Sequence, residues 1–247
     1  MTRLLIIGPP GSGKGTQAVQ IAKHFRIPTV STGEIFRINV SHETPLGVEA
    51  AKYLDDGAFV PDHLTNALVK DRLLDADLQP GFLLDGYPRT APQIVELDNI
   101  LASQSHRLDA VVELRAPDSE LEQRMLRRAK EQGRKDDTID VFRHRLDLYH
   151  SETHEVVAVY AGRGILVSVD GSGDPSAITT RAIAAVEKFL ATRVSHENCS
   201  DRRQRKTGTA CGPQADRRRP PGAEPGPGGG TAPRVGNRGP AQLWPGP

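Results

Sequence analysis

A glycine-rich run directly after a short apolar stretch is the feature that most limits how this chain can fold. Leu4 to Ile7 is a continuous apolar run, typical of a strand covered on both faces in a parallel sheet. The glycines that follow, Gly8, Gly11, Gly13 and Gly15, let a ligand approach the main chain closely. If Lys14 to Phe25 forms a helix, its unpaired first-turn amides point into the same concavity. The stretch therefore predicts a site for an anion.

The spacing of this run identifies the kind of anion. From Gly8 through Gly13 to Lys14 it fits a phosphate-binding loop, in which the lysine reaches the outer phosphates of a nucleotide. Gly15 stands where Ser or Thr is usual, and Thr16 follows, so direct binding of magnesium by the Thr16 hydroxyl is not assumed. The alternative is a glycine-rich turn with an incidental lysine, which the strand before it and the helix after it disfavour.

The composition changes abruptly near Ser195. Residues 195–247 contain nine prolines and ten glycines, and Trp244 is their only aromatic residue. Such a segment buries too little apolar surface to offset its ordering entropy, so we expect 195–247 to be a disordered tail. It carries nine Lys or Arg against four Asp or Glu, a net charge of +5, which leaves −4 for residues 1–194. An acidic domain argues against general binding of nucleic acid and predicts phosphate affinity confined to a pocket.

Both cysteines, Cys199 and Cys211, lie in this tail. The remaining residues therefore offer no disulfide and no cysteine metal site, as expected in a reducing compartment. No apolar run approaches the roughly twenty residues of a membrane span, and the start MTRLLIIG lacks the cleavage pattern of a signal peptide. We expect a cytoplasmic protein without membrane contact.

Helical and strand patterns alternate along residues 1–194. Further strands are expected at 28–30, 82–84, 110–114 and 165–169, and helices at 31–37, 46–55, 62–74, 93–102, 119–132, 138–160 and 175–191. Ser31 and Glu34 have the spacing of a capping box. Five short strands separated by helices predict an α/β fold with a five-stranded parallel sheet and helices on both faces. Ligands of such folds bind at the carboxyl ends of the strands, where both glycine-bearing motifs fall.

The second of these motifs places Asp85 at the end of a strand, directly before Gly86. A carboxylate at this position can hold magnesium, through water or directly, beside phosphates bound at the first loop. The alternative is an ordinary turn residue. Arg89 follows four residues later, fixed by Pro88, and a simple ion pair with Asp85 is its structural alternative.

Arginines are abundant for an acidic domain. Arg124 and Arg128 lie four residues apart on one helix face, a spacing that costs a few tenths of a kcal/mol unless an anion lies between them. The candidate phosphate ligands are Lys14, Arg37, Arg89, Arg124, Arg128, Arg134 and Arg145. A solvated basic face, partly neutralised by Glu120 and Glu131, is the alternative. Phosphoryl transfer, which depends on positioning and charge neutralisation, explains why no pair of nucleophile and base is evident.

GPPGSGKGTQA, STGEIFR, GFLLDGYPRTAPQ and RKDDTIDVFRHRLDLYH carry a family resemblance. They closely resemble the adenylate kinases, a family of nucleoside monophosphate kinases, in their short-lid bacterial type. The match runs from about Arg3 to Leu190, and the DGYPR block with Gln93 is highly specific. The resemblance implies a P-loop kinase domain at 1–194 that transfers the γ-phosphoryl group of MgATP reversibly to AMP. It also implies a small helical AMP-binding segment at 31–60 and a short lid at 128–134.

Site residues follow from the resemblance position by position. It implies that ATP is held by Gly11, Ser12, Gly13, Lys14, Gly15, Thr16, Arg124, Arg128 and backbone near Gly171. It implies that AMP is held by Thr32, Arg37, Ala58, Phe59, Val60, Gly86, Arg89, Gln93, Arg134 and Arg145. The implied catalytic set is Lys14, Asp85, Arg89, Arg124, Arg128, Arg134 and Arg145, with Asp85 acting on magnesium through water.

Some of these positions also have local interpretations. Thr32 can be only a helix-start residue, and Asp136 or Asp137 is favoured as the cap of the helix that follows. Gln93 could be a surface residue, but an amide that both donates and accepts suits an adenine edge. Only five residues separate Arg128 from Arg134, so the lid must be a short loop without the zinc-type cysteine cluster of some relatives. The tail after Ser195 is absent from the family pattern.

Three rival functions remain at this stage. A UMP/CMP-type monophosphate kinase shares the fold, but its relatives carry SAG in place of STG and Asn after the Pro-Arg pair, so Thr32 and Thr90 favour AMP. A kinase of small-molecule hydroxyls would use Asp85 as its base, and the acceptor-side residues argue against it. The third rival is a nucleotide-dependent binding module whose basic tail contacts nucleic acid. The size suits a monomer.

Overall fold

The computed structural model describes the backbone of residues 1–132 and 138–206, and the side chains of 1–127 and 138–193. The chain separates into two units, Met1–Arg193 and Val194–Pro247. The backbone of 128–132 is described and helical, but the side chains of the expected lid 128–134, all of Arg134 and the tail from residue 207 onward lie outside the described residues. The account below concerns the first unit unless stated otherwise.

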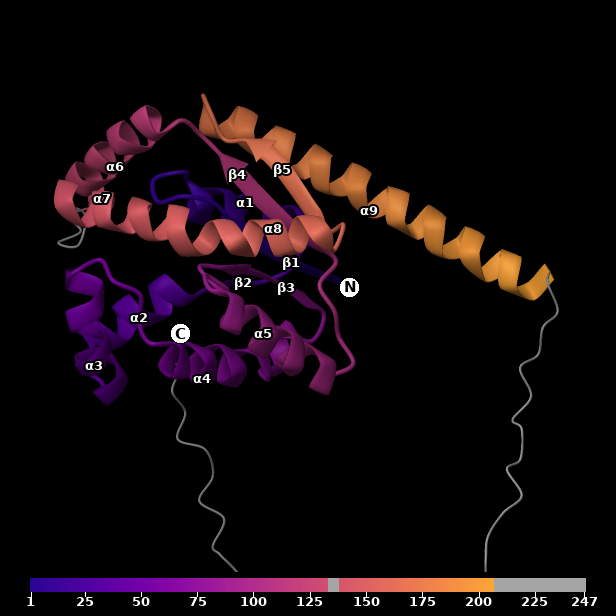
Figure 1. The fold of residues 1–247 in the computed structure, drawn as a ribbon, viewed down its shortest axis with the longest axis horizontal. Coiled ribbons are helices and arrows are strands. Elements are labelled where there is room, and N and C mark those ends of the chain that lie inside the picture. Colours follow the sequence, from indigo (N-terminus) through magenta and orange to yellow (C-terminus); the bar gives the residue numbers. More distant parts are fainter. Residues whose placement is uncertain (133–137, 207–247) are drawn as a thin grey trace, which may run out of the picture. The chain divides into compact units, whose positions relative to one another are not determined.

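A five-stranded parallel sheet organises this unit (Figure 1). Its strands are β1 (Thr2–Ile7), β2 (Thr29–Ser31), β3 (Gly81–Asp85), β4 (Ala110–Arg115) and β5 (Leu166–Asp170). They run in the order β2-β3-β1-β4-β5, so β1 is central and its register sets Ile6 opposite Asp85. The carboxyl ends of β1 and β3 therefore lie side by side, which confirms the predicted α/β fold and brings the two glycine-bearing motifs together.

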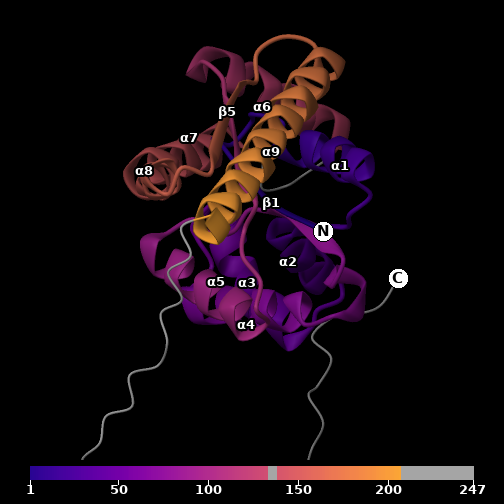
Figure 2. The same ribbon diagram turned by 90° about the vertical axis from the view of Figure 1, so that its right-hand side faces the viewer.

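Nine α-helices and two short turns of helix surround the sheet in the described part of the chain. They are α1 (Lys14–Phe25), α2 (Thr32–Ser41), α3 (Pro45–Asp55), α4 (Asp62–Leu73), η1 (Ala76–Leu78), α5 (Ala91–Ser103), α6 (Asp118–Gln132), α7 (Ile139–Leu148), the π-helical η2 (Tyr149–Thr153), α8 (His154–Gly162) and α9 (Pro175–Lys206). Helices α4 and α5 pack against each other and lie together in Figure 2. The expected elements are thus present, with ends displaced by a few residues.

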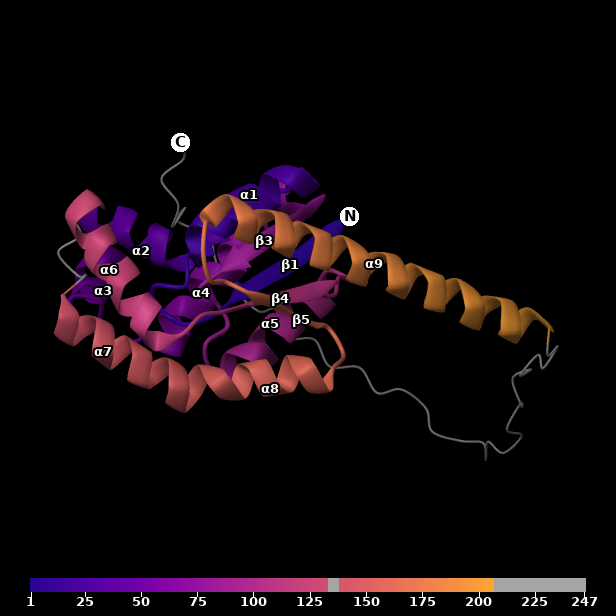
Figure 3. The same cartoon turned by 90° about the horizontal axis from the view of Figure 1, so that it is seen from above.

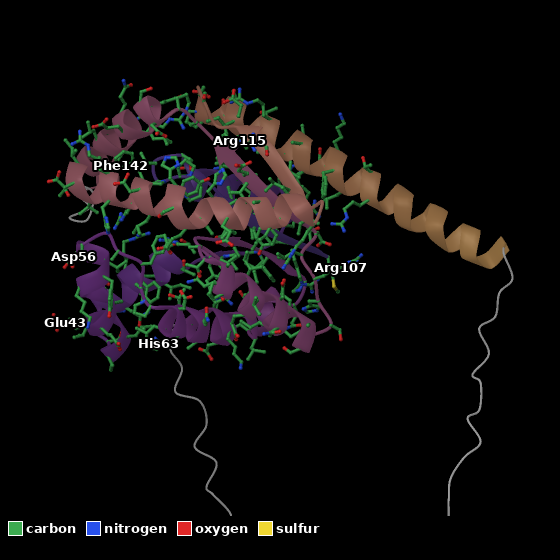
Figure 4. The ribbon with its side chains drawn as sticks, in the orientation of Figure 1. Glu43, Asp56, His63, Arg107, Arg115 and Phe142 are labelled. Atoms are coloured by element: carbon green, nitrogen blue, oxygen red, sulfur yellow. The ribbon has the colours of Figure 1, made fainter. Side chains whose placement is uncertain are left out.

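Helices cover both faces of the sheet, as predicted. Figure 3 shows α1 and the start of α9 on one side and α5 and α8 on the other. On the first side Ile6 and Val112 pack with Ile21 of α1 and Ala182 of α9, all fully buried. A smaller cluster joins α6 to α7, where Phe142, labelled in Figure 4, packs on Leu121 and Met125. The arm formed by α6 and α7 thus has its own apolar contacts.

A compact helical pair, α2 and α3, follows β2. Ser31 caps α2 by accepting a hydrogen bond from the Glu34 N–H at 3.4 Å, which agrees with the predicted N-cap. Helix α3 crosses α2 so closely that a Cβ on Gly47 would overlap the backbone carbonyl of Asn39. The predicted AMP-binding segment, 31–60, therefore begins with two helices that are in direct backbone contact.

The long helix predicted over 138–160 is present but not uniform. It consists of α7, the π-helical turn η2 and α8 in succession. The favoured cap, Asp136 or Asp137, is wrong: Thr138 is the N-cap, with extended backbone and a side-chain oxygen that accepts from the Val141 N–H at 3.3 Å. A threonine hydroxyl placed directly before the first helical residue meets the N3 amide by the usual capping geometry.

Helix α9 continues to Lys206, so it includes the first twelve residues, 195–206, of the segment for which the composition predicts disorder. No Pro or Gly occurs between Ser176 and Lys206, and the first residue of either type after them is Gly208. Helix propagation therefore meets no breaker before that point. The composition of the whole tail hides this difference because its prolines and glycines all lie after Lys206.

Candidate nucleotide-binding site

The glycine loop closes tightly over the end of β1. Gly11 has a φ of +80°, and a Cβ there would lie 2.7 Å from the carbonyl oxygen of Leu121 in α6. Both facts require glycine. Gly13, at φ +84°, is the N-cap of α1, so the loop leads straight into the N-terminus of that helix. The predicted sequence of strand, loop and helix is present, with the first-turn amides of α1 at the loop.

Lys14 folds back over this loop. Its Nζ donates to the carbonyl oxygens of Gly8 at 2.7 Å and Pro9 at 2.8 Å. The Ser12 hydroxyl is fully buried and has no hydrogen-bond partner among the described residues. A charged ammonium group and an unsatisfied buried hydroxyl on one glycine loop are the features expected where phosphate oxygens bind.

A cavity of about 700 Å³ extends from the loop to α2, α3 and α7. It is lined by fourteen of the predicted site residues: Gly11, Ser12, Gly13, Lys14, Gly15, Thr16, Arg37, Ala58, Phe59, Asp85, Gly86, Arg89, Arg124 and Arg145. Four predicted residues do not line it, namely Thr32, Val60, Gln93 and Gly171. The cavity volume is within the range of small-molecule sites.

Asp85 stands at the cavity wall where β3 ends. It is 9% exposed, and its Oδ2 lies 3.8 Å from the point where Gly15 would carry a Cβ. Burial raises the pKa of the Asp85 carboxyl, while the charges of Lys14 and Arg89 act in the opposite direction. The carboxylate therefore faces the phosphate loop, where the sequence placed it.

Arg89 lies in the turn that follows the same strand. Its Nε donates to the Gly86 carbonyl at 2.8 Å, and its guanidinium lies 5.1 Å from the centre of the Phe59 ring. Burial lowers the pKa of Arg89, and the Asp85 charge opposes that shift. Two contacts fix the guanidinium plane, so Arg89 presents an oriented fork to the cavity.

Thr32 and Gln93 lie behind the cavity wall. Thr32 Oγ1 donates to the Asp85 carbonyl at 3.4 Å. Gly86 passes so close to Thr32 that a Cβ on Gly86 would lie 2.7 Å from Thr32 Oγ1. The Gln93 side chain is 2% exposed, so the surface interpretation of Gln93 is wrong. It accepts from the Arg89 N–H at 2.8 Å and donates to Asp62 at 2.7 Å. Both residues therefore contact the backbone of the DGYPR block from behind.

On the α6 side, Arg124 contacts the loop between β5 and α9. Its Nη2 donates to Glu120 at 2.6 Å and to the Gly173 carbonyl at 3.3 Å, and the Gly173 N–H donates to Glu120 at 3.2 Å. Gly173 lines the cavity, whereas the N–H of the predicted Gly171 donates to the Arg115 carbonyl at 2.6 Å. Gly173, two positions after Gly171, is thus the residue of this loop at the cavity wall, and the ATP contact of backbone near Gly171 stays a prediction.

Arg127 also lines the cavity and was missed as a site residue. The sequence feature that could have identified Arg127 is its position three residues after Arg124, which places both side chains on one helix face. Arg145 reaches the cavity from α7, and its Nη2 donates to the Leu54 carbonyl at the end of α3, 3.1 Å away. Basic side chains from α1, α2, α6 and α7 and from the turn after β3 therefore line one cavity.

A protein-family model described as adenylate kinase matches residues 6–165, which include the loop, β3 and most of the cavity wall. The chain belongs to the adenylate kinase family. It is 58% identical to the adenylate kinase of Pseudarthrobacter chlorophenolicus, over 76% of this chain and 97% of that protein. It is 54% identical to that of Renibacterium salmoninarum, over 78% of this chain and all of the relative. About a quarter of this chain lies outside both alignments.

These relatives favour phosphoryl transfer between adenine nucleotides over the pyrimidine-nucleotide rival. An adenylate kinase is a nucleotide-binding phosphotransferase, and the basic lining of the cavity suits phosphate ligands. No helix in the described part of the chain is long and apolar enough to cross a membrane. Nor do the described residues contain a group of three or more His, Cys, Asp or Glu able to hold a metal ion.

Proposed function

We propose that the 700 Å³ cavity binds both nucleotides of the reaction ATP + AMP = 2 ADP. The ATP phosphates would lie on the glycine loop, beside Lys14 and Arg124. AMP would lie toward α2 and α3, with its phosphate near Arg37 and Arg89. The observation that carries the proposal is the meeting of the glycine loop and basic residues from five parts of the chain in one cavity of a domain whose net charge is −4.

The chemistry needs little from the protein besides position and charge. An AMP phosphate oxygen attacks the γ-phosphorus of ATP, and the bond from that phosphorus to the β-phosphate oxygen breaks, leaving two ADP. The attacking oxygen is already ionised, so no general base is needed. Lys14, Arg89, Arg124 and Arg145 neutralise charge on the transferred group, and we assign Arg128 and Arg134 to the same task from the sequence alone.

Asp85 is the residue that would hold magnesium, through a water molecule. A single buried carboxylate facing a phosphate loop fits Mg²⁺, which keeps several waters and is held by one or two carboxylates together with substrate phosphates. Magnesium bound there would neutralise charge on the ATP phosphates.

The wider assignments are part of the same proposal. Residues 1–194 act as the kinase domain, 31–60 as the AMP-binding segment and 128–134 as a short lid without zinc, and 195–247 is not needed for catalysis. The protein works as a monomer in the cytoplasm, in adenine nucleotide homeostasis. Light scattering of the purified chain tests the monomer, because a dimer would double the measured mass.

Acceptor choice tests the function itself. We expect the full chain to form ADP from MgATP and AMP much faster than from UMP, CMP or dAMP. A preference for UMP or CMP, or no turnover at all, would overturn the proposal.

The binding site is tested by Arg89→Lys. Lysine cannot reproduce the fork held by Gly86 and Phe59, so KM for AMP should rise about tenfold or more. Arg107→Lys is the matched control, because Arg107 is exposed and precedes β4, at the amino ends of the strands (Figure 4). Equal effects of the two changes would contradict the assignment of Arg89.

A further inference from the structure

A buried hydrogen-bond network determines which way round the side-chain amide of Gln93 lies. Its Oε1 accepts from the backbone N–H of Arg89 at 2.8 Å, and its Nε2 donates to Oδ1 of Asp62 at 2.7 Å. Oδ2 of Asp62 accepts from the Thr90 hydroxyl at 3.2 Å. Because Gln93 is only 2% exposed, water does not compete for these contacts. The network joins the first residue of α4 to the first turn of α5.

Both neighbours of the amide require the same orientation. A backbone N–H can only donate, and a carboxylate can only accept. If the Gln93 amide turned over, its oxygen would face the Asp62 carboxylate and its NH₂ group would face the Arg89 N–H. Two buried pairs of like polar groups would result, without solvent to relieve them. Asp62 and the Arg89 N–H therefore act together to exclude the turned amide.

This orientation matters for the choice between purine bases. The six-membered edge of adenine offers an acceptor, N1, and a donor, the 6-amino group. Hypoxanthine and guanine offer the reverse, a donor at N1 and an acceptor at O6. A free glutamine amide pairs with either pattern by turning over. After its bonds to Arg89 and Asp62, the Gln93 amide retains one N–H and one lone pair, in the fixed orientation.

We propose that Asp62 is a positioning residue that makes the AMP site select adenine over 6-oxopurines by holding the Gln93 amide in one orientation. This rests on the proposed AMP site and on the AMP-binding role that the family resemblance implies for Gln93. The position of Asp62 suits the task, because the first turn of α4 stabilises a carboxylate there and α4 packs directly on α5. Neither Asp62 nor Gln93 lines the cavity. Gln93 lies directly behind Arg89, which does line it, so the base contact requires the Gln93 amide to reach the base past that wall, and Asp62 acts only through Gln93.

The test is Asp62→Asn in the full chain, with AMP and IMP compared as acceptors. IMP has the 6-oxopurine hydrogen-bond pattern without the 2-amino group of GMP, so it reports the pattern alone. The new amide can accept from Gln93 or, turned, donate to it, while Thr90 keeps a partner either way. We expect the ratio of kcat/KM for AMP to that for IMP to fall about tenfold, largely because IMP improves, with KM for ATP unchanged.

Asp98→Asn is the matched control. It makes the same chemical change on α5, at a carboxylate that pairs with Arg163 on the surface, and should leave the AMP to IMP ratio as it is. The proposal is overturned if Asp62→Asn leaves the ratio unchanged, or if it impairs AMP without any gain for IMP, as a merely structural residue would.

Gln93→Leu distinguishes failure of this orientation mechanism from failure of the proposed AMP site. If KM for AMP does not rise in Gln93→Leu, Gln93 does not contact the base, and the assigned AMP site is wrong at this position. If KM for AMP rises but Asp62→Asn leaves the ratio unchanged, the AMP contact stands and only the orientation mechanism fails.

Discussion

Two buried tyrosines offer a test of how hydrogen bonding stabilises this domain. Tyr87 and Tyr160 are both 0% exposed. The Tyr87 hydroxyl donates to Oδ1 of Asn66 at 2.8 Å, whereas the Tyr160 hydroxyl has no hydrogen-bond partner among the described residues. Replacement by Phe removes one oxygen from each site and keeps the ring. The two variants should therefore change stability in opposite directions.

The magnitudes follow from the two environments. Tyr87→Phe loses a hydrogen bond with a net value of about 1 kcal/mol. Tyr160→Phe removes a hydroxyl whose burial without a partner costs about 1–3 kcal/mol. For a domain of this size, 1 kcal/mol shifts Tm by about 2–4 °C. Tyr87→Phe should thus melt about 3 °C below the unaltered protein and Tyr160→Phe at least about 3 °C above it.

Differential scanning calorimetry of the three proteins at pH 7 measures this. Burial raises the pKa of both tyrosines, so neither ionises near pH 7. The difference in Tm therefore contains no contribution from tyrosine ionisation. Adenylate kinase activity at 25 °C serves as the check that each variant is folded. If Tyr160→Phe lowers Tm as much as Tyr87→Phe does, the Tyr160 hydroxyl has a partner in solution and the reasoning fails.

Three other changes probe the loop, the α2–α3 contact and the buried carboxylate. Lys14→Met should lower kcat at least about a hundredfold, whereas Lys23→Met, at the exposed end of the same helix, should not, as steady-state assays will show. Gly47→Ala should cost about 1–3 kcal/mol in urea unfolding because its Cβ overlaps the backbone of α2, whereas Gly162→Ala meets open space and should not destabilise. Asp85→Asn should lose activity yet raise Tm at pH 7. Burial raises the pKa of Asp85 above its ordinary value of 3.8, so the ionised carboxylate destabilises the folded state at pH 7 and the protonated carboxyl does not. The gain in Tm from Asp85→Asn should therefore shrink as the pH is lowered toward 4.

Local patterns predicted the parts of this site that depend on neighbours in the sequence. The loop from Gly8 to Lys14 needs only a strand before it, a helix after it and glycines at positive φ, and all of these are local. The position of Asp85 was also predictable, because a parallel sheet brings the carboxyl ends of its strands to one edge. The cap at Ser31 is a contact between residues three apart.

The features that the sequence did not predict depend on partners far along the chain. Gln93 is buried because Asp62, thirty-one residues earlier, accepts its N–H. Gly173 reaches the cavity because Glu120 binds its N–H from another helix. No periodicity or spacing within one element carries information on such contacts, since each depends on how two elements pack.

Three cations of the cavity donate hydrogen bonds to backbone carbonyls. Lys14 donates to Gly8 and Pro9, Arg89 to Gly86 and Arg145 to Leu54, in every case to a backbone carbonyl. A carbonyl dipole orients a cation, but it is a weaker acceptor than a carboxylate or a phosphate.

Arg124 differs, because it donates to the Glu120 carboxylate as well as to the Gly173 carbonyl. A phosphate oxygen that replaces one of the carbonyl acceptors of Lys14, Arg89 or Arg145 gains the charge-assisted part of the interaction. Phosphates that draw Arg124 away must instead compete with a carboxylate, which lowers the gain at that residue. Arg124 is thus a point at which phosphate binding must rearrange the contact between α6 and the loop after β5.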